Sequence, residues 1–303
     1  MDSPSLSRSS SSVPSLSATL ELLKPITWFA PMWAFGCGIV SSGATVSQHL
    51  GMLFLGAALS GPLVCGTSQA VNDWFDRHVD AINEPNRPIP SGRIPGRWGL
   101  YIGIAWSLVS LIVAAAMGQA ILLAAIFGLA MAWAYSAPPF RFKKNGWLGN
   151  SAVGLCYEGL PWFTGAAAMT GGLPEPSILL LALLYSIGAH GIMTLNDFKS
   201  VEGDTRLGLL SLPVQLGVDR AAKLACVVMA VPQIIVIALL VSWHAPYHAA
   251  LVCALLIAQF QLMRRLLNNP EKEAAFYNAT GTTLYVLGML VSAFALSTTG
   301  VSA

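Results

Sequence analysis

The stretch QAVNDWFDRHVD, residues 69–80, follows a long apolar run and continues it as a helix. Residues three, four and seven positions apart share one face of a helix, so the polar residues of this stretch form one stripe: Gln69, Asn72, Asp73, Asp76 and Asp80. Like charges this close repel each other. A hard divalent cation such as Mg²⁺, which takes carboxylates and substrate phosphates as ligands, would offset the repulsion. The alternative is a solvated helix end with scattered acidic residues.

The composition is that of a polytopic membrane protein. Hydrophobic residues make up 55% of the 303 residues, charged residues only 10%, and the mean hydropathy is +0.64. Soluble domains carry about a quarter charged residues. With a net charge of +2 and no basic block, the sequence gives no indication of nucleic-acid binding.

Nine apolar segments are long enough to cross a bilayer, which takes about 20 apolar residues. They predict an all-α fold of nine transmembrane helices around a central cavity that opens at the cytoplasmic side. The expected spans are residues 25–46, 50–73, 98–117, 119–136, 149–170, 176–196, 221–243, 246–267 and 277–299.

Lysine and arginine are distributed asymmetrically along these spans. All 16 lie before the first span or in every second loop, and positive charge collects in cytoplasmic loops. We therefore expect a cytoplasmic N-terminus, a C-terminus on the far side, and acidic motifs that face the cytoplasm. The Ser-rich residues 1–22 are expected to be a disordered tail, and residues 23–303 a single transmembrane domain.

A second acidic motif ends the sixth predicted span. The Asn-Asp pair of residues 72–73 recurs at residues 196–197, followed by Glu202 and Asp204. Two acidic clusters that face each other across a cavity can hold two metal ions on one polyanion. The alternative is that two clusters share a membrane face by chance.

The cytoplasmic loops also supply basic side chains that suit a diphosphate, because Arg makes bidentate contacts to phosphate oxygens. The candidates are Arg87, Arg141, Lys143 and Lys199. The alternative for each is a topological charge without substrate contact. We favour a functional role for Arg87, which precedes Pro88 in a tight Pro/Gly segment.

Two ionisable residues lie deep inside predicted spans, where they are functional candidates. His190 shares a helical face with Asp197 and either contacts substrate or is a neutral histidine bonded to a neighbouring helix. Glu158 either has a functional role or is simply protonated or paired. The five cysteines are interpreted as reduced, small, buried side chains, because they lie in apolar runs without a CxxC motif.

The motifs together resemble those of the UbiA-type intramembrane prenyltransferases. Asn72-x-x-x-Asp76-x-x-x-Asp80 and Asp197…Asp204 look like the two metal motifs of that superfamily. Residues 72–94, 135–139 and 196–204 look like its chlorophyll synthase branch. Within that branch, residues 96–101, 156–165 and 189–195 look most like bacteriochlorophyll synthases of anoxygenic phototrophs. The resemblance runs from about residue 23 to residue 300.

The resemblance implies esterification of the propionate of bacteriochlorophyllide a with geranylgeranyl or phytyl diphosphate. The cofactor would be Mg²⁺, with Mn²⁺ as a substitute, and the location a bacterial inner (intracytoplasmic) membrane. Pigment-protein assembly factors would receive the apolar product. One departure concerns the fourth position after the first Asp of the second motif, which is Val201. Glu202 is the expected stand-in for the missing acid.

Roles for individual residues follow from the acidic clusters, the basic loops and this resemblance. Catalysis is assigned to Asp76, Asp197 and Arg87. Metal binding is assigned to Asn72, Asp76, Asp80, Asp197 and Asp204. Substrate binding is assigned to Arg87, Arg141, Lys143, Lys199, His190 and Glu158.

Three alternatives stay open from the sequence. The pigment could be chlorophyllide a. A secondary transporter also has many spans, but transporter sites lie near the midplane at broken helices, whereas these carboxylates gather on one face. A pigment-binding chaperone without catalysis would need no metal clusters.

Overall fold

The computed structural model describes residues 13–299, and in this part the regular secondary structure is helical apart from one isolated β-bridge. The first half contains α1 Leu16–Leu23, η1 Pro25–Trp28, α2 Phe29–Ser41, η2 Val46–Gln48, α3 Leu50–Ala58, η3 Leu59–Cys65, α4 Gly66–Asn83, α5 Trp98–Met117 and α6 Gln119–Ser136. The second half contains η4 Phe142–Lys144, α7 Gly146–Gly154, η5 Leu155–Gly159, α8 Leu160–Thr170, α9 Pro176–Asn196, η6 Asp197–Ser200, α10 Val201–Arg206, α11 Leu212–Leu216, α12 Val218–Ser242, α13 Pro246–Asn268 and α14 Pro270–Thr299.

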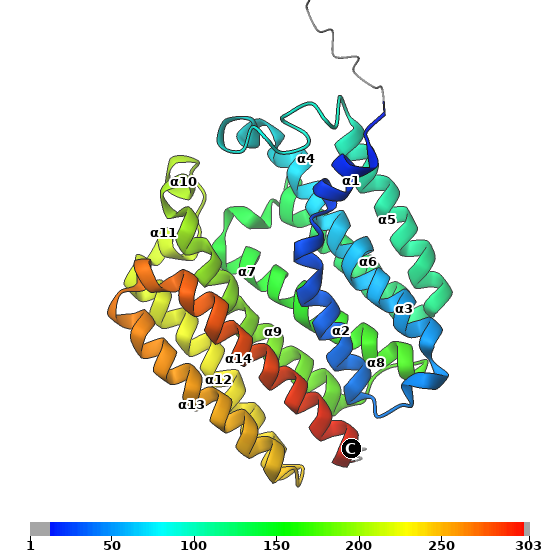
Figure 1. The fold of residues 1–303 in the computed structure, drawn as a ribbon, viewed down its shortest axis with the longest axis vertical. Coiled ribbons are helices and arrows are strands. Elements are labelled where there is room, and N and C mark those ends of the chain that lie inside the picture. Colours follow the sequence, from blue (N-terminus) through cyan, green and yellow to red (C-terminus); the bar gives the residue numbers. More distant parts are fainter. Residues whose placement is uncertain (1–12, 300–303) are drawn as a thin grey trace, which may run out of the picture.

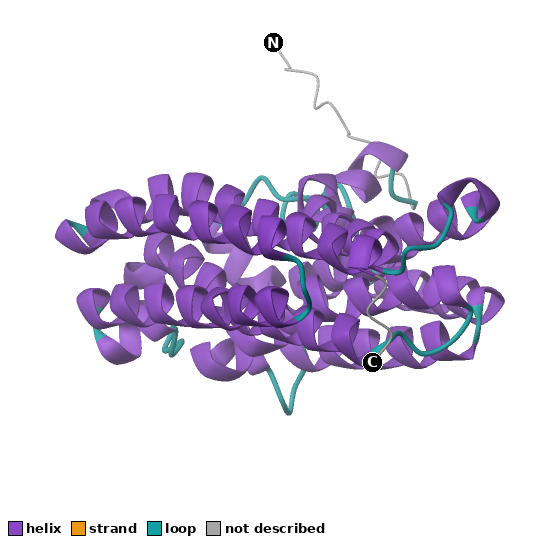
Figure 2. Cartoon of the chain, turned by 90° about the horizontal axis from the view of Figure 1, so that it is seen from below, coloured by secondary structure: helices purple, strands orange, loops and turns teal. Residues whose placement is uncertain are grey.

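The long helices run side by side, and three of the short helices lie at one end. Figure 1 shows α1, α10 and α11 at the end where α4 terminates, with the last turns of α14 at the opposite end. Figure 2 shows the described chain as helices joined by loops. The ends of α4 and α9, which carry the two acidic motifs, therefore lie at the same end of the bundle.

Seven helices in residues 13–299 are long and apolar enough to cross a membrane. The all-α membrane fold is confirmed, but the predicted number of nine spans is not. The two predicted spans that fall short are residues 25–46 and 149–170. In the first, α2 has only 13 residues, because the 3₁₀ turn η1 begins at Pro25 and the helix ends before Gly43, whose φ is +67°. In the second, α7, η5 and α8 form one continuous helix, but polar residues such as Asn150 and Glu158 lower its mean hydropathy.

Part of the predicted disordered tail is a helix. The Ser15 hydroxyl accepts a hydrogen bond from the Ala18 amide at 3.2 Å and begins α1 as an N-cap. Leu22 and Leu23 are buried against the rest of the chain. The prediction of disorder is therefore wrong for residues 16–22, because serine-rich composition hid a cap and an apolar face. Residues 1–12 of the predicted tail lie outside the described residues.

Two π-helical segments interrupt the long helices on the inside of the bundle. Pro62 lies in η3, where its missing N–H removes a regular helical hydrogen bond and favours a wider turn. The second segment, η5, contains Glu158. Both segments contribute side chains to the cavity described below. All five cysteines are free, and Cys37, Cys65 and Cys226 are buried, as predicted for them.

Helices α2 and α8 pack with almost no space between their backbones. A Cβ on Gly38 would lie 2.0 Å from the carbonyl oxygen of Trp162, and one on Gly165 would lie 2.1 Å from that of Phe35. Glycine at both positions therefore permits the close approach that forms one wall of the bundle.

Replacing Gly38 with Ala should destabilise the protein by about 1–3 kcal/mol, because the added methyl group meets backbone that cannot move without separating the helices. We expect the melting temperature in detergent to fall by about 5 °C. Gly36→Ala on the same helix is the matched control, since a Cβ there would meet nothing within 4 Å. Equal melting temperatures for the two variants would contradict the packing argument.

Candidate active site

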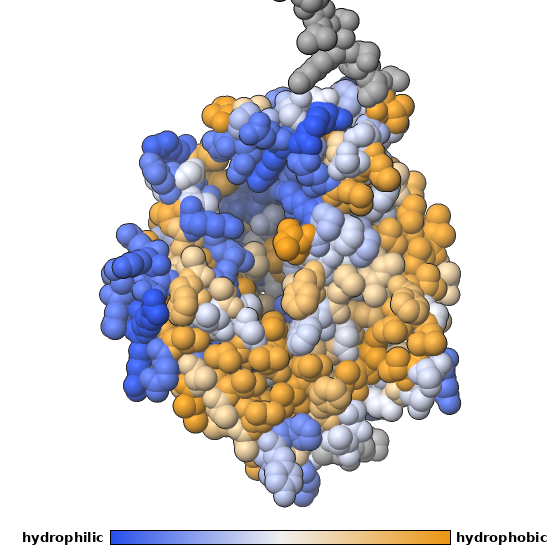
Figure 3. Space-filling view, viewed as in Figure 1, coloured by the Kyte–Doolittle hydropathy of each residue, from blue (hydrophilic) through white to orange (hydrophobic). Residues whose placement is uncertain are grey.

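A cavity of about 580 Å³ lies inside the bundle, lined by α2, η3, α4, α6, η5, α9 and α14 among other segments. Most of its lining is apolar, and polar residues enter it at a few points: Ser60, Gln69, Asn72, Tyr135, Glu158 and Asn196. Figure 3 shows a hollow in this face of the molecule, with hydrophilic residues above and beside it and hydrophobic residues below. The cavity thus offers an apolar chamber with a polar mouth.

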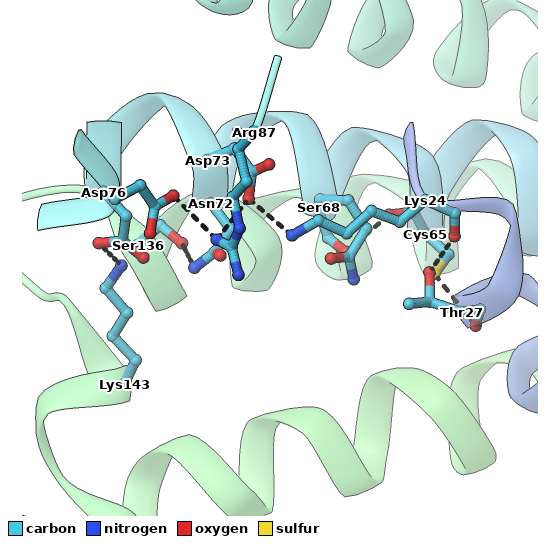
Figure 4. Close-up of polar contacts among 12 residues, drawn as sticks. Lys24, Thr27, Cys65, Ser68, Asn72, Asp73, Asp76, Arg87, Ser136 and Lys143 are labelled. Atoms are coloured by element: carbon cyan, nitrogen blue, oxygen red, sulfur yellow. Dashed lines mark hydrogen bonds and ion pairs between the residues drawn. The ribbon is translucent and has the colours of Figure 1, made fainter. Parts of the chain in front are cut away.

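Helix α4 carries a row of polar side chains from the cavity to its mouth (Figure 4). Gln69 donates a hydrogen bond to the Tyr157 hydroxyl at 2.9 Å, and the Asn72 amide donates to the Ser136 hydroxyl at 3.3 Å. Both contacts orient the amide groups, and both amide residues line the cavity. The predicted stripe on α4 is therefore present, and its deeper end faces the chamber.

Two carboxylates of the stripe are buried and paired with basic side chains. Lys24 lies 2.7 Å from Asp73 Oδ1, and the Arg87 guanidinium lies 3.5 Å from the same oxygen and 2.8 Å from Asp80 Oδ2. The second oxygen of Asp73 is buried without a hydrogen-bond partner. Arg87 thus bridges two acids, a pairing that the sequence did not predict, and its predicted contact with a diphosphate stays a prediction. Lys24 was not predicted as a site residue.

The third carboxylate of α4 reaches the basic loop between α6 and α7. Asp76 is paired with Lys143 and lies 3.7 Å from the Arg141 guanidinium. Burial lowers the pKa of the Lys143 ammonium, and the neighbouring Asp76 carboxylate opposes that shift. The structure therefore brings these three predicted site residues together at the mouth.

The second acidic motif sits across the mouth on η6 and α10. Asn150 of α7 donates a hydrogen bond to Asp197 Oδ2 at 3.2 Å, and the Ser200 hydroxyl donates to Asp204 Oδ2 at 3.2 Å. Glu202, the expected stand-in for the acid missing at residue 201, is exposed instead and pairs with Arg206 at 2.5 Å. Its role in the cluster therefore has no support from the geometry.

Backbone pairing joins the basic loop to the second motif. The Gly146 amide donates to the Leu210 carbonyl at 2.7 Å, and the Leu210 amide donates to the Lys144 carbonyl at 3.0 Å. This short pairing fixes the segment after Lys143 against the segment after Asp204. The basic loop consequently lies between the two acidic motifs.

The donor set at the mouth suits a hard divalent cation, since it consists of carboxylate and amide oxygens. Among residues 13–299, no group of three or more His, Cys, Asp or Glu side chains is arranged to hold a metal ion. The α4 carboxylates contact basic side chains, and the second motif offers two carboxylates, Asp197 and Asp204. The metal sets predicted from the sequence therefore stay predictions.

The remaining predicted substrate-binding residues differ in their placement. Lys199 is exposed on η6. His190 is buried with its ring centroid 5.8 Å from that of Trp147, and it is absent from the residues that line the cavity. His190 therefore packs against α7, but its Nδ1 is buried without a hydrogen-bond partner, so its role stays a prediction. Glu158 does line the cavity, and its Oε2 is buried without a partner.

Comparisons with known proteins agree with this architecture. Residues 27–297 match the UbiA prenyltransferase family. The chain is 58% identical over 285 residues to the bacteriochlorophyll synthase 33 kDa chain of Cereibacter sphaeroides, covering 94% of each chain. It is 39% identical over 287 residues to the chloroplastic chlorophyll synthase of Arabidopsis thaliana, covering 91% of this chain and 73% of that protein.

A solved structure supports the fold alone. The UbiA homolog from Archaeoglobus fulgidus, bound to DMAPP and Mg²⁺, superimposes with a TM-score of 0.71 at 23% identity, covering 88% of this chain and 99% of the other. At this low identity, the comparison concerns the arrangement of helices and not the ligands.

Proposed function

The chain belongs to the UbiA prenyltransferase family, and from this premise we propose that it esterifies the propionate of bacteriochlorophyllide a with geranylgeranyl or phytyl diphosphate. The observation that carries the proposal is the 58% identity, over 94% of both chains, to a bacteriochlorophyll synthase. The 39% identity to a chlorophyll synthase makes chlorophyllide a the second candidate acceptor.

Family membership makes the chain an enzyme, a prenyltransferase, and excludes the transporter and chaperone alternatives. The apolar cavity with a polar mouth fits this class, since a prenyl diphosphate has a hydrocarbon tail and a charged head. The diphosphate would lie at the mouth, between the two acidic motifs, and the chamber would receive the hydrocarbon tail together with the apolar body of the acceptor.

The basic residues around the mouth suit the diphosphate. Arg141 and Lys143 belong to the basic loop between α6 and α7, which lies between the two acidic motifs. Arg87 lies beside Asp73 and Asp80. Asn72, Asp76 and Asp80 on α4, with Asp197 and Asp204 opposite, would hold Mg²⁺. When bound, the ion would supply Lewis-acid stabilisation of charge on the departing diphosphate. Mn²⁺ would suit the same oxygen donors.

The acceptor needs no general base. A propionate with a pKa of about 4–5 is already ionised at neutral pH, so it captures an allylic cation directly once the C–O bond to the diphosphate breaks. Arg87, Arg141 and Lys143 would stabilise the charge that develops on the leaving group. The apolar chamber keeps out water, which would otherwise capture the same cation.

The location proposed is a bacterial inner membrane with a cytoplasmic N-terminus and a periplasmic C-terminus. Two observations support it: the asymmetry of all 16 basic residues relative to the nine spans predicted from the sequence, and the separation of α1 from the last turns of α14 at opposite ends of the bundle (Figure 1). The active-site mouth would then face the cytoplasm. Transfer of the product to pigment-protein assembly factors stays a prediction.

Removal of divalent metal should abolish product formation. We expect membranes that contain the protein to esterify bacteriochlorophyllide a with geranylgeranyl diphosphate and Mg²⁺, and to lose this activity fully with EDTA, because the diphosphate then departs without its counter-charge. Added Mg²⁺ should restore the activity. A parallel assay with chlorophyllide a shows which of the two pigments is the acceptor. Undiminished ester formation in EDTA would contradict the metal assignment, and no ester with either pigment would contradict the acceptor class.

A further inference from the structure

Glu158 is a buried acid that the proposed mechanism does not use. Its side chain lies in the π-helical turn η5, is 5% exposed and lines the cavity. Its Oε2 is buried and has no hydrogen-bond partner. None of the ion pairs formed within residues 13–299 includes it.

The adjacent residue has partners that Glu158 lacks. The Tyr157 hydroxyl accepts a hydrogen bond from Gln69 at 2.9 Å and contacts Cys65 Sγ at 3.4 Å. Tyr157 is therefore held by α4, while Glu158 lines the cavity with one carboxyl oxygen that has no partner. π-Helical turns often occur at functional sites, because the wider turn redirects side chains.

An unpaired carboxylate is expensive to bury, whereas the protonated acid is tolerated and carries an O–H that can donate a hydrogen bond. An apolar residue would fill the same space without this desolvation cost. A retained acid at this depth therefore points to a ligand that accepts a hydrogen bond in the chamber.

The depth of Glu158 separates it from the diphosphate. It follows Asn150, which contacts Asp197 at the mouth, by eight residues of continuous helix. At about 1.5 Å per residue, this places Glu158 roughly 12 Å from the mouth along the helix axis. The group it contacts therefore belongs to the apolar body of a substrate.

Of the two substrates, only the pigment has a suitable acceptor atom in its apolar body. The prenyl chain is a hydrocarbon, whereas the macrocycle carries ring carbonyls, namely an acetyl and a ring keto group. We propose that Glu158 donates a hydrogen bond to a ring carbonyl oxygen of the acceptor pigment and so orients its propionate toward the mouth. This inference rests on the proposed function.

Two variants of similar size test the inference. Glu158→Leu removes the donor, and we expect the KM for bacteriochlorophyllide a to rise about tenfold while the KM for geranylgeranyl diphosphate stays within twofold. Glu158→Gln keeps an N–H donor and should stay within about threefold of the wild type for both substrates. An unchanged pigment KM in the Leu variant, or an equal rise in the Gln and Leu variants, would overturn the inference.

A spectroscopic measurement without turnover provides the second readout. In wild-type protein loaded with pigment alone, resonance Raman spectra should show one ring carbonyl stretch at the lowered frequency of a hydrogen-bonded group, and Glu158→Leu should return it to the free position. The shifted band, acetyl or keto, identifies the carbonyl. Two free bands in the wild type would overturn the inference even if the Leu variant fails to fold. A wild type that forms no pigment ester would instead contradict the proposed function.

Discussion

Asp76→Asn is expected to lower the rate of prenyl transfer by at least about 100-fold. Asp76 is the carboxylate of α4 that reaches the basic loop, where it pairs with Lys143 and lies 3.7 Å from Arg141. Asparagine keeps the shape but removes the negative charge that would hold a divalent cation on the diphosphate. The loss should appear in kcat, because the missing charge acts most strongly while the diphosphate leaves.

A matched control separates this effect from general loss of charge. Asp219 is exposed at the start of α12, in a loop predicted to lie on the same side of the membrane. Asp219→Asn should retain nearly full activity. Asparagine leaves Lys143, whose side chain is 10% exposed, without its counter-charge, so we expect a lower melting temperature and the rates are compared at a temperature where both proteins are folded. Full activity in the Asp76 variant would contradict its assignment to the metal.

The sequence was sufficient to predict the helical membrane fold because apolar length and basic loops report directly on bilayer crossing. It was insufficient where local sequence and packing decide where a helix begins, ends or widens. Helix α2 is short because Pro25 and Gly43 bracket it, and the continuous helix from α7 to α8 contains a π-helical turn that hydropathy does not reveal. Helix α1 was missed because a single Ser15 cap and two buried leucines define it.

The residues of the candidate site also fall into a group that the sequence predicted and a group that it did not. Helical spacing placed Asn72, Asp76 and Asp80 on one face of α4, since that spacing depends on one helix alone. Spacing along one helix could not predict which residues of other segments contact these side chains. Lys24 beside Asp73 and Asn150 beside Asp197 are contacts across 49 and 47 residues of chain.

Periodicity also left the direction of single side chains undetermined. His190 shares a helical face with Thr194, yet it packs against Trp147 of α7 and does not line the cavity. Glu158 does line the cavity, because the π-helical turn around it alters the regular 3.6-residue spacing. A face of a helix can be predicted from its own residues, but the neighbour that covers the face cannot.

Asp197→Asn is expected to reduce prenyl transfer by about 100-fold or more. Asp197 is the acid of the second motif that faces Asn150, whose amide donates to it at 3.2 Å. The carbonyl oxygen of an asparagine at residue 197 can accept the same hydrogen bond, so the local structure should persist. The loss would therefore report the missing charge on the side of the mouth opposite α4. Initial rates at saturating concentrations of both substrates measure the effect.

Glu202→Gln is the control for this variant, and it also decides which acids form the second cluster. Glu202 is two residues before Asp204, but its side chain is 81% exposed and pairs with Arg206. Exposed ion pairs contribute little, so Glu202→Gln should keep activity within about twofold. A loss as large as that of the Asp197 variant would show that Glu202 turns inward to replace the acid absent at Val201. Equal activity in both variants and the wild type would instead contradict the assignment of Asp197 to the metal, and would leave Asp204 as the remaining assigned acid opposite α4.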